Sequence, residues 1–375
     1  MSTKEQAAEN QRADFTLGVD VGGTKVAAGL VDARGTILFQ TRVAMPARED
    51  AAAGFAAVER AINAIFAAQP QARAAVTGIG ICAPGPLDPI RGVVLNPPNL
   101  PCWRDFPLAA ELQRAFHVCA KVDNDANAAA LAEAVWGAGV GFRNVLYATL
   151  GTGIGTGIIF DRRIYHGRTG SAAEGGHVSI DYSGPRCGCG KRGCIEALCS
   201  GPAIARRARA RLAESNAPSC MRELAGGNHE KLTAETVAEA FREGDTLARE
   251  VLEATADLLT VWLGNLIDLL EPDVIVFGGG VAQLMSEFFP RMQAELPKWC
   301  INSRCCEIPL LLAKYGADAG IPARPLSASS SARIPSSRYG GSVWESNPPF
   351  DPLRTESPAL KAGEITGPLS PPGEV

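Results

Sequence analysis

The sequence predicts an α/β protein built from two similar halves. Two stretches repeat one pattern, an apolar strand, a Gly/Thr turn and a second apolar strand: "FTLGVDVGGTKVAAGLVD" (Phe15–Asp32) and "VLYATLGTGIGTGIIFD" (Val145–Asp161). A third glycine cluster follows an apolar strand in "DVIVFGGGVAQLMSEFF" (Asp273–Phe289). One hairpin in each half indicates a duplicated architecture, and 375 residues suffice for two domains.

The bulk composition is that of a globular protein and excludes several classes of partner. Hydrophobic residues make up 46% and charged residues 20% of the chain, and the net charge is −4. Nucleic acid and anionic membranes call for a basic surface, so neither is expected as a partner. The polar N-terminus is unlike a signal peptide, and no apolar run suggests a membrane span, so we expect a cytoplasmic protein. Its 11 cysteines are then not expected to form disulfides.

The first hairpin places an acid beside a glycine turn. Asp20 interrupts a hydrophobic strand, and a buried carboxylate is costly unless it is paired or near a cation. Gly22 and Gly23 permit close backbone approach, and Thr24 adds a hydroxyl donor. These features favour a site for Mg²⁺ and phosphate, although a plain β-hairpin with a Gly-Gly turn explains this stretch equally well on its own.

The other two glycine clusters strengthen the nucleotide interpretation. The second hairpin repeats the first, so two phosphate-binding turns are expected to face each other across a cleft. The glycines after the Asp273–Phe277 strand let a flat ring lie against the backbone. Each cluster alone is weak evidence, but three of them after apolar strands point to a nucleotide.

"KVDNDANAAALAEAVWG" (Lys121–Gly137) is a short strand that becomes an alanine-rich helix. Asn124 or Asp125 is explained in part as a helix N-cap. Three consecutive polar residues exceed what a cap needs, and a carboxylate at this junction is suited to act as a general base on a hydroxyl. Asn99, in the proline-rich loop that also holds Trp103, adds an amide of the kind that binds sugar hydroxyls.

"HVSIDYSGPRCGCGKRGCIE" (His177–Glu196) carries the spacing H-x9-C-x-C-x4-C. Three cysteines and one histidine are a standard ligand set for a closed, structural zinc site; the alternative is a glycine-rich loop with incidental thiols. Glu174 and Glu196 flank this loop, so it is expected to bring Glu174, His177 and Glu196 to one substrate pocket. The predicted zinc ligands are His177, Cys187, Cys189 and Cys194.

These residues resemble the ROK family (repressor, ORF, kinase), and within it the glucokinases. The matching motifs are "DVGGTK", "APGPLD", "PPNLPCW", "DNDANAAALAE", "GTGIGTGI", "EGGH", "CGCGKRGCIE" and "GGGVA". The resemblance implies an actin-like fold, in which two ribonuclease-H-like α/β lobes flank a cleft. It also implies ATP-dependent phosphorylation of a hexose, with ATP, Mg²⁺ and structural Zn²⁺ as cofactors.

The resemblance also assigns roles to the matching residues. Asp125 would be the catalytic base, and Asn99, Asn124, Glu174, His177 and Glu196 would contact the sugar. Asp20, Gly22, Gly23, Thr24 and Lys25 would form the first phosphate element, and Thr152 and Gly153 the second. Gly278 and Gly279 would lie beside the adenosine. His177 would bind zinc through one ring nitrogen and a sugar hydroxyl through the other.

We therefore expect a glucokinase that phosphorylates the 6-hydroxyl of glucose. N-acetylglucosamine, N-acetylmannosamine, mannose and fructose stay open as substrates, as does polyphosphate as the donor. A non-catalytic sugar-binding regulator is the alternative from another class. We expect a homodimer or homotetramer.

The expected domains are a disordered leader (1–14), an N-terminal lobe (15–126), a C-terminal lobe (127–320) with the zinc loop at 177–194, and a low-complexity tail (321–375). The leader is too short for the winged-helix domain of the family's DNA-binding repressors. After "YGADAGIP" (Tyr315–Pro322), family kinases would continue with a small-residue helix that packs on the first lobe. This chain instead turns rich in Pro, Ser and Gly. We favour a wrong-frame tail over a natural extension.

Overall fold

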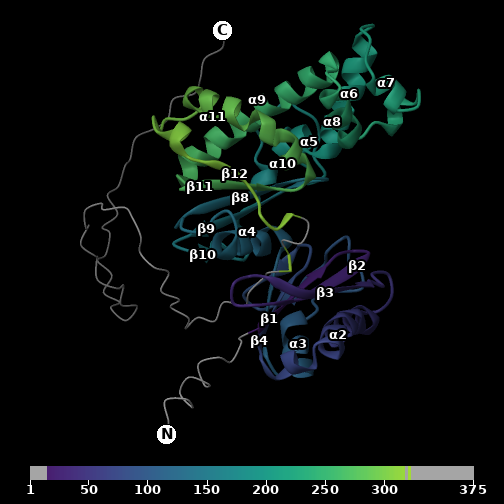
Figure 1. The fold of residues 1–375 in the computed structure, drawn as a ribbon, viewed down its shortest axis with the longest axis vertical. Coiled ribbons are helices and arrows are strands. Elements are labelled where there is room, and N and C mark those ends of the chain that lie inside the picture. Colours follow the sequence, from purple (N-terminus) through teal and green to yellow (C-terminus); the bar gives the residue numbers. More distant parts are fainter. Residues whose placement is uncertain (1–14, 317–319, 322–375) are drawn as a thin grey trace, which may run out of the picture. The chain divides into compact units, whose positions relative to one another are not determined.

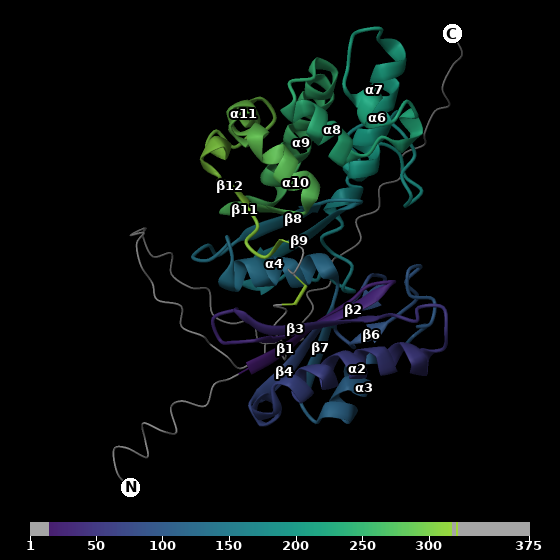
Figure 2. The ribbon, with the colours of Figure 1, turned by 45° about the vertical axis from the view of Figure 1, so that its right-hand side comes forward.

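The computed structural model describes residues 15–316 and 320–321, which contain two five-stranded sheets and their helices (Figures 1 and 2). Residues 1–14 and 322–375, which include the predicted leader and nearly all of the predicted tail, lie outside the described residues. The proposed domain boundaries stay predictions.

The first sheet has the strand order β3-β2-β1-β4-β7. β1 pairs antiparallel with β2, and β2 with β3, whereas β1 with β4 and β4 with β7 are parallel. The strands are β1 (Phe15–Val21), β2 (Lys25–Val31), β3 (Ile37–Ala44), β4 (Val76–Cys82) and β7 (Cys119–Asp123). A two-stranded ribbon, β5 (Leu87–Asp88) and β6 (Val93–Val94), and the turn η1 (Pro70–Ala74) complete this part of the chain.

Alternation along β1 decides which side chains form the first core. Leu17, Val19 and Val21 are buried in one cluster with residues of the helices α2 (Ala51–Ala68) and α3 (Leu108–Phe116). Gly18 and Asp20 therefore belong to the opposite face. Gly18 is itself covered by Ile321, because a methyl group there would overlap the Ile321 carbonyl oxygen, whereas Asp20 near the end of the strand is only partly buried.

The second sheet repeats this topology with the order β10-β9-β8-β11-β12. β8 with β9 and β9 with β10 are antiparallel, and β8 with β11 and β11 with β12 are parallel. The strands are β8 (Val145–Leu150), β9 (Ile154–Phe160), β10 (Arg163–Ile164), β11 (Val274–Gly278) and β12 (Leu310–Leu312). Identical strand order in both sheets confirms the duplicated α/β fold.

A larger helical layer covers one face of the second sheet, centred on the long helix α9 (Figure 1). Asp245 caps α9 by accepting a hydrogen bond from the Ala248 amide. The helices of this layer are α5 (Ile195–Cys199), α6 (Gly201–Glu214), α7 (Met221–Leu224), α8 (Ala234–Arg242), α9 (Thr246–Leu270), α10 (Gly280–Met285) and α11 (Phe289–Glu295). The short turns are η2 (Gly175–His177), η3 (His229–Lys231), η4 (Ser286–Phe288), η5 (Leu296–Lys298) and η6 (Cys305–Glu307).

Helix α4 (Asp125–Trp136) lies between the two sheets in both views (Figures 1 and 2). Its alanines fit this place because they allow close approach: a methyl group added at Gly157 of β9 would lie 2.5 Å from Ala130 Cβ. On the other side, Ala128 packs on Cys82 at the end of β4. The first residue of this central helix is Asp125.

Ile321, the first residue of the predicted tail, is buried against Ala27 and Val31 of β2.

Among the described residues, α2 alone is long and apolar enough to cross a membrane, and a core helix passes the same test. Because a buried face of α2 packs in the first core, this is weak evidence for a span.

Candidate functional site

Three neighbouring parallel strands of the first sheet end at one edge. Asp20 of β1 pairs in register with Cys82 of β4, and Cys82 with Asp123 of β7. The Cys82 thiol donates to Asp20 Oδ1 at 3.4 Å. Burial raises the pKa of Cys82 well above its usual value, and the charges of Asp20, Asp125 and Asp123 raise it further. Carboxylates thus gather where ligands of open α/β sheets bind.

Asp125 stands at the N-terminus of α4, directly after this edge. Asn124 is the N-cap, since its Oδ1 accepts a hydrogen bond from the Asn127 amide at 2.7 Å. The N-cap explanation therefore applies to Asn124 and not to Asp125. Asp125 Oδ1 accepts from the Ala126 amide at 2.8 Å. The Asp125 side chain remains accessible to solvent, but surrounding protein desolvates it and raises its pKa.

The first glycine turn contacts the proline-rich loop. The Gly22 amide bonds to the Lys25 carbonyl at 2.9 Å, which closes the turn between β1 and β2. A methyl group at Gly23 would lie 2.8 Å from the Asn99 carbonyl oxygen, so a larger residue would push the two loops apart. Asn99 itself is exposed. Glycine at position 23 therefore brings Asn99 beside the first hairpin.

The second glycine turn is tied to Glu196. Glu196 Oε2 accepts a hydrogen bond from the Ile154 amide at 3.0 Å, and a methyl group at Gly153 would lie 2.7 Å from the same oxygen. Ala126, next to Asp125, contacts the adjacent residue Gly155: a methyl group there would lie 3.2 Å from Ala126 Cβ. The start of β9 thus links the end of α4 that carries Asp125 to Glu196.

The four predicted metal ligands come together. One ligand atom from each of His177, Cys187, Cys189 and Cys194 lies within 4.8 Å of all the others. His177 Nδ1 faces the cluster at 3.6 Å from Cys187 Sγ, and the Cys189 and Cys194 sulfurs lie 3.7 Å apart. Burial raises the pKa of Cys194 to about 12, so this thiol needs a cation to deprotonate it at neutral pH. Three thiols and an imidazole fit a tetrahedral, sulfur-seeking metal ion.

The turn that carries Glu174 is fixed by two residues that sequence reasoning missed. Thr156 Oγ1, buried in β9, donates to the Ala173 carbonyl at 2.5 Å and accepts from the Gly175 amide at 2.8 Å. The buried Trp262 of α9 donates through Nε1 to the Gly175 carbonyl at 3.0 Å. A threonine in an apolar strand and a tryptophan inside a long helix were the available signals.

The third glycine cluster lies against the second hairpin. Gly279 has a φ of +90°, and a methyl group there would lie 2.2 Å from the Leu150 carbonyl oxygen. Gly278 pairs in register with Thr149 of β8. Beside them lies a cavity of about 230 Å³, lined by Phe277, Gly278, Gly279, Gly280, Gln283, Leu312, Ala313 and Gly316. Thr152, between Gly151 and Gly153, belongs to the same hairpin turn.

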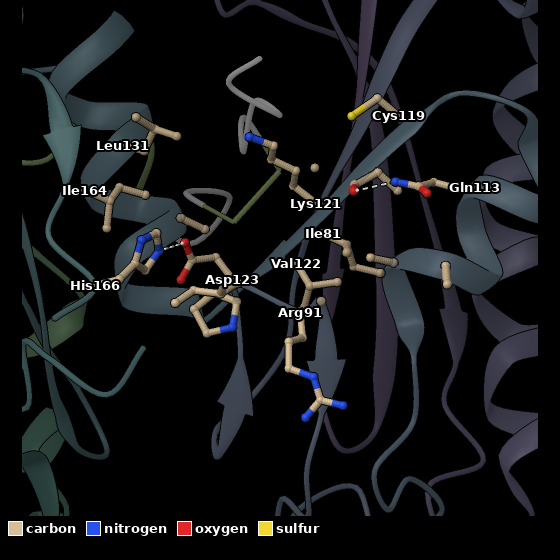
Figure 3. Close-up of a pocket in the computed structure, with 18 of the residues that line it drawn as sticks. Ile81, Arg91, Gln113, Cys119, Lys121, Val122, Asp123, Leu131, Ile164 and His166 are labelled. Atoms are coloured by element: carbon tan, nitrogen blue, oxygen red, sulfur yellow. Dashed lines mark hydrogen bonds and ion pairs between the residues drawn. The ribbon is translucent and has the colours of Figure 1, made fainter. Parts of the chain in front are cut away.

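A larger pocket of about 500 Å³ opens beside β7 and β10 rather than at Asp125 (Figure 3). Its lining includes Asp123 but neither Asn124 nor Asp125. In its wall His166 points at Asp123, while the Lys121 and Arg91 side chains point away from each other. The pocket is therefore next to the candidate site without being part of it, and His166 is a third residue that sequence reasoning missed.

Comparisons with known proteins identify one matching family and several relatives. The sequence model of the ROK family matches residues 16–322. A glucokinase of Thermotoga maritima is 33% identical over 308 residues, which are 81% of this chain and 94% of that protein. Among solved structures, this chain is similar to the crystal structure of a ROK family glucokinase from Streptomyces griseus in complex with glucose and AMPPNP. The two sequences are 35% identical and the TM-score is 0.64, and the match covers 82% of this chain and 97% of that protein's chain. A xylose repressor of Bacillus subtilis is 26% identical over 83% of this chain and 76% of its own length.

Proposed function

The chain belongs to the ROK family, and from that premise we propose that it is a sugar kinase, by preference an ATP-dependent glucokinase acting on the 6-hydroxyl of glucose. The observation that carries this proposal is the position of Asp125. It is an accessible carboxylate with a raised pKa, on a helix between two sheets that each contain a glycine-rich hairpin, β1–β2 and β8–β9. The glucose and AMPPNP named for the Streptomyces griseus relative support the same substrates.

In the proposed reaction Asp125 accepts the proton of the sugar hydroxyl, and the hydroxyl oxygen attacks the γ-phosphorus of ATP in line. The raised pKa of Asp125 makes it a better base than an ordinary aspartate. The Gly22 and Gly151 amides donate within their own turns, so the backbone amides proposed to bind the phosphates are those of Gly23, Thr24, Thr152 and Gly153. Mg²⁺ that arrives with ATP, held near Asp20, would neutralise phosphate charge.

Asn99, Asn124, Glu174, His177 and Glu196 are the proposed sugar contacts. His177 turns Nδ1 to the cysteine cluster, which leaves Nε2 for a sugar hydroxyl. Glu196 accepts from the Ile154 amide through Oε2, and its Oε1 lies 3.7 Å from Cys187 Sγ and 3.9 Å from His177 Nδ1. Once a metal ion holds Cys187 and His177, Oε1 is the oxygen proposed to face the substrate. We propose Zn²⁺ as the ion of the cluster, where it would hold the loop and orient His177. Gly278 and Gly279 are the proposed adenosine neighbours, and a homodimer or homotetramer is the proposed assembly.

The test is release of ADP from Mg-ATP with glucose, fructose, mannose, N-acetylglucosamine and N-acetylmannosamine in parallel. We expect turnover, with glucose giving the highest kcat/KM. Turnover that is highest with another hexose would keep the kinase and replace the substrate.

The second candidate is a sugar-binding regulator without turnover, and the similarity to a xylose repressor is the observation that favours it. Sugar binding by calorimetry, with no ADP release on any of the five sugars, would establish this alternative. Turnover would exclude it.

A further inference from the structure

His166 makes a short hydrogen bond that joins the two sheets. It follows β10 of the second sheet, and its Nε2 lies 2.6 Å from Oδ2 of Asp123, the last residue of β7 in the first sheet (Figure 3). The exposed fractions of the His166 and Asp123 side chains are 31% and 18%, so the pair is half-buried. A hydrogen bond this short, partly shielded from solvent, holds both side chains in one orientation.

The other oxygen of Asp123 holds the start of α4. Asp123 Oδ1 accepts from the Asn124 amide and from Asn127 Nδ2, each at 2.8 Å. Asn127 is fully buried in α4, so its bond to Asp123 cannot shift without disturbing the helix. Asp125 lies between the two residues that Asp123 holds. The orientation of the Asp123 carboxylate therefore sets the course of the backbone into Asp125.

His166 also belongs to the segment that carries the proposed sugar ligands of the second sheet. Its carbonyl accepts from the Ala172 amide at 3.1 Å, and the chain reaches Glu174 two residues later. Gly170, which lies between His166 and Ala172 and has a φ of +90°, closely approaches Pro89, the residue after β5. A methyl group at Gly170 would lie 2.4 Å from Pro89 Cδ. His166 thus connects the loop that leads to Glu174 with strand β7, which leads to Asp125.

We propose that His166 is a positioning residue: through its bond to Asp123, it fixes the position of Asp125 relative to the segment of the second half that leads to Glu174. The inference rests on the proposed function. A misplacement of about 1 Å costs on the order of 100-fold in rate. The loss is expected in kcat, because His166 and Asp123 contact neither substrate in this scheme. Their bond also raises the pKa of His166, against the opposing effects of burial and Lys121.

The test compares His166→Leu with His166→Gln, whose amide nitrogen can occupy the place of Nε2. We expect His166→Leu to lower kcat between about 10- and 100-fold, with KM for glucose and ATP changed less than about threefold. His166→Gln should recover most of kcat. Arg163→Gln, in the wall of the same pocket, is the matched control and should leave kcat unchanged.

A double-mutant cycle asks whether His166 acts through Asp123. In the Asp123→Ala background, which has no side-chain acceptor for His166, His166→Leu should cost little further kcat, because the bond is already absent. Full kcat in His166→Leu, or additive losses in the double variant, would overturn the inference. So would a loss of kcat in His166→Gln equal to that in His166→Leu. If the leucine variant does not fold, a loss of about 10-fold or more in His166→Gln alone, relative to wild type, would overturn the inference. A wild-type protein without turnover on any sugar would instead refute the proposed function, and the inference would fall with it.

Discussion

The Asp125 carboxylate combines solvent access with partial desolvation. It begins α4, where the Ala126 amide stabilises its charge and lowers its pKa, while the surrounding protein raises the pKa by a larger amount. A base that must take a proton from a hydroxyl gains from such a rise as long as it stays ionised near neutral pH.

The pH dependence of the proposed activity follows from this shift. Asp125 works as a base only when ionised, so kcat/KM should fall as the pH falls through its folded-state pKa. Because that pKa is raised, the fall should begin at a higher pH than the ordinary value of 3.8 dictates. Rates between about pH 4 and pH 8 measure the profile. A profile governed by a group at or below the ordinary value would contradict the assignment.

The His166–Asp123 pair predicts a pH-dependent stability of the opposite sense. A raised folded-state pKa means that the charged pair stabilises the fold fully below the unfolded value of 6.5, and that this is lost as the pH rises through the folded value. The charged groups lining the pocket are Asp123, Lys121, Arg91 and Arg163.

His166→Gln keeps the hydrogen bond but never charges, so it isolates this effect. It should lower Tm by a few degrees near pH 6 and by almost nothing near pH 9. Arg163→Gln again serves as the control. An equal Tm difference at both pH values would show that the charge of His166 contributes nothing.

At the scale of elements, the cysteine loop and the turn before it form one unit against β9. A methyl group at Gly176 would lie 1.8 Å from the Ile154 carbonyl oxygen. Ile154 also donates the bond that holds Glu196. The distance between the η2 turn and β9 therefore determines the positions of both Glu174 and Glu196.

Gly176→Ala should consequently lower both stability and activity. Overpacking of this kind costs about 1–3 kcal/mol in the free energy of unfolding, which denaturant titration can measure. The matched control is Gly188→Ala in the adjacent cysteine loop, where the added methyl group meets open space. It should leave the free energy of unfolding and the activity almost unchanged. Equal stability of the two variants would show that the turn shifts without cost.

Metal content tests the cysteine loop itself. Purified protein should carry about one zinc per chain, and Cys187→Ser should lose it together with turnover. Cys119→Ser, at an exposed cysteine outside the cluster, is the control. Full activity in metal-free protein would refute the role given to the metal.

At the scale of the whole molecule, the proposed site draws on both sheets, so contacts between them matter. Trp136 Nε1, at the end of α4, donates to the Ala33 carbonyl at 3.1 Å. The Tyr315 hydroxyl donates to the Gly35 carbonyl at 2.9 Å. Both bonds hold the turn between β2 and β3 of the first sheet to segments that pack with the second.

Tyr315→Phe removes one of these bonds and should loosen the tie. Because the proposed sugar contacts come from both sheets, kcat should fall and KM for glucose should rise together, each by about two- to fivefold. Tyr182→Phe, at a side chain 91% exposed, is the control. A change in stability without any change in kcat or KM would mean that the tie is purely structural.

What the sequence revealed depended on how far apart the interacting residues lie along the chain. The cluster of three cysteines and one histidine was predictable because its four residues fall within one short loop, and the duplicated sheets were predictable because each hairpin is local. The bonds from Asp123 to His166 and from Gly175 to Trp262 span 43 and 87 residues. Such contacts depend on how elements far apart in the sequence pack together, which no local pattern reports.

The central claim, that Asp125 is the base of a sugar kinase, is tested most directly by ADP release from Mg-ATP and glucose with wild-type protein and Asp125→Asn. We expect turnover in the wild type and a loss on the order of 1,000-fold in the variant, with glucose binding measured by calorimetry largely kept. A near-normal kcat in the variant would remove Asp125 as the base.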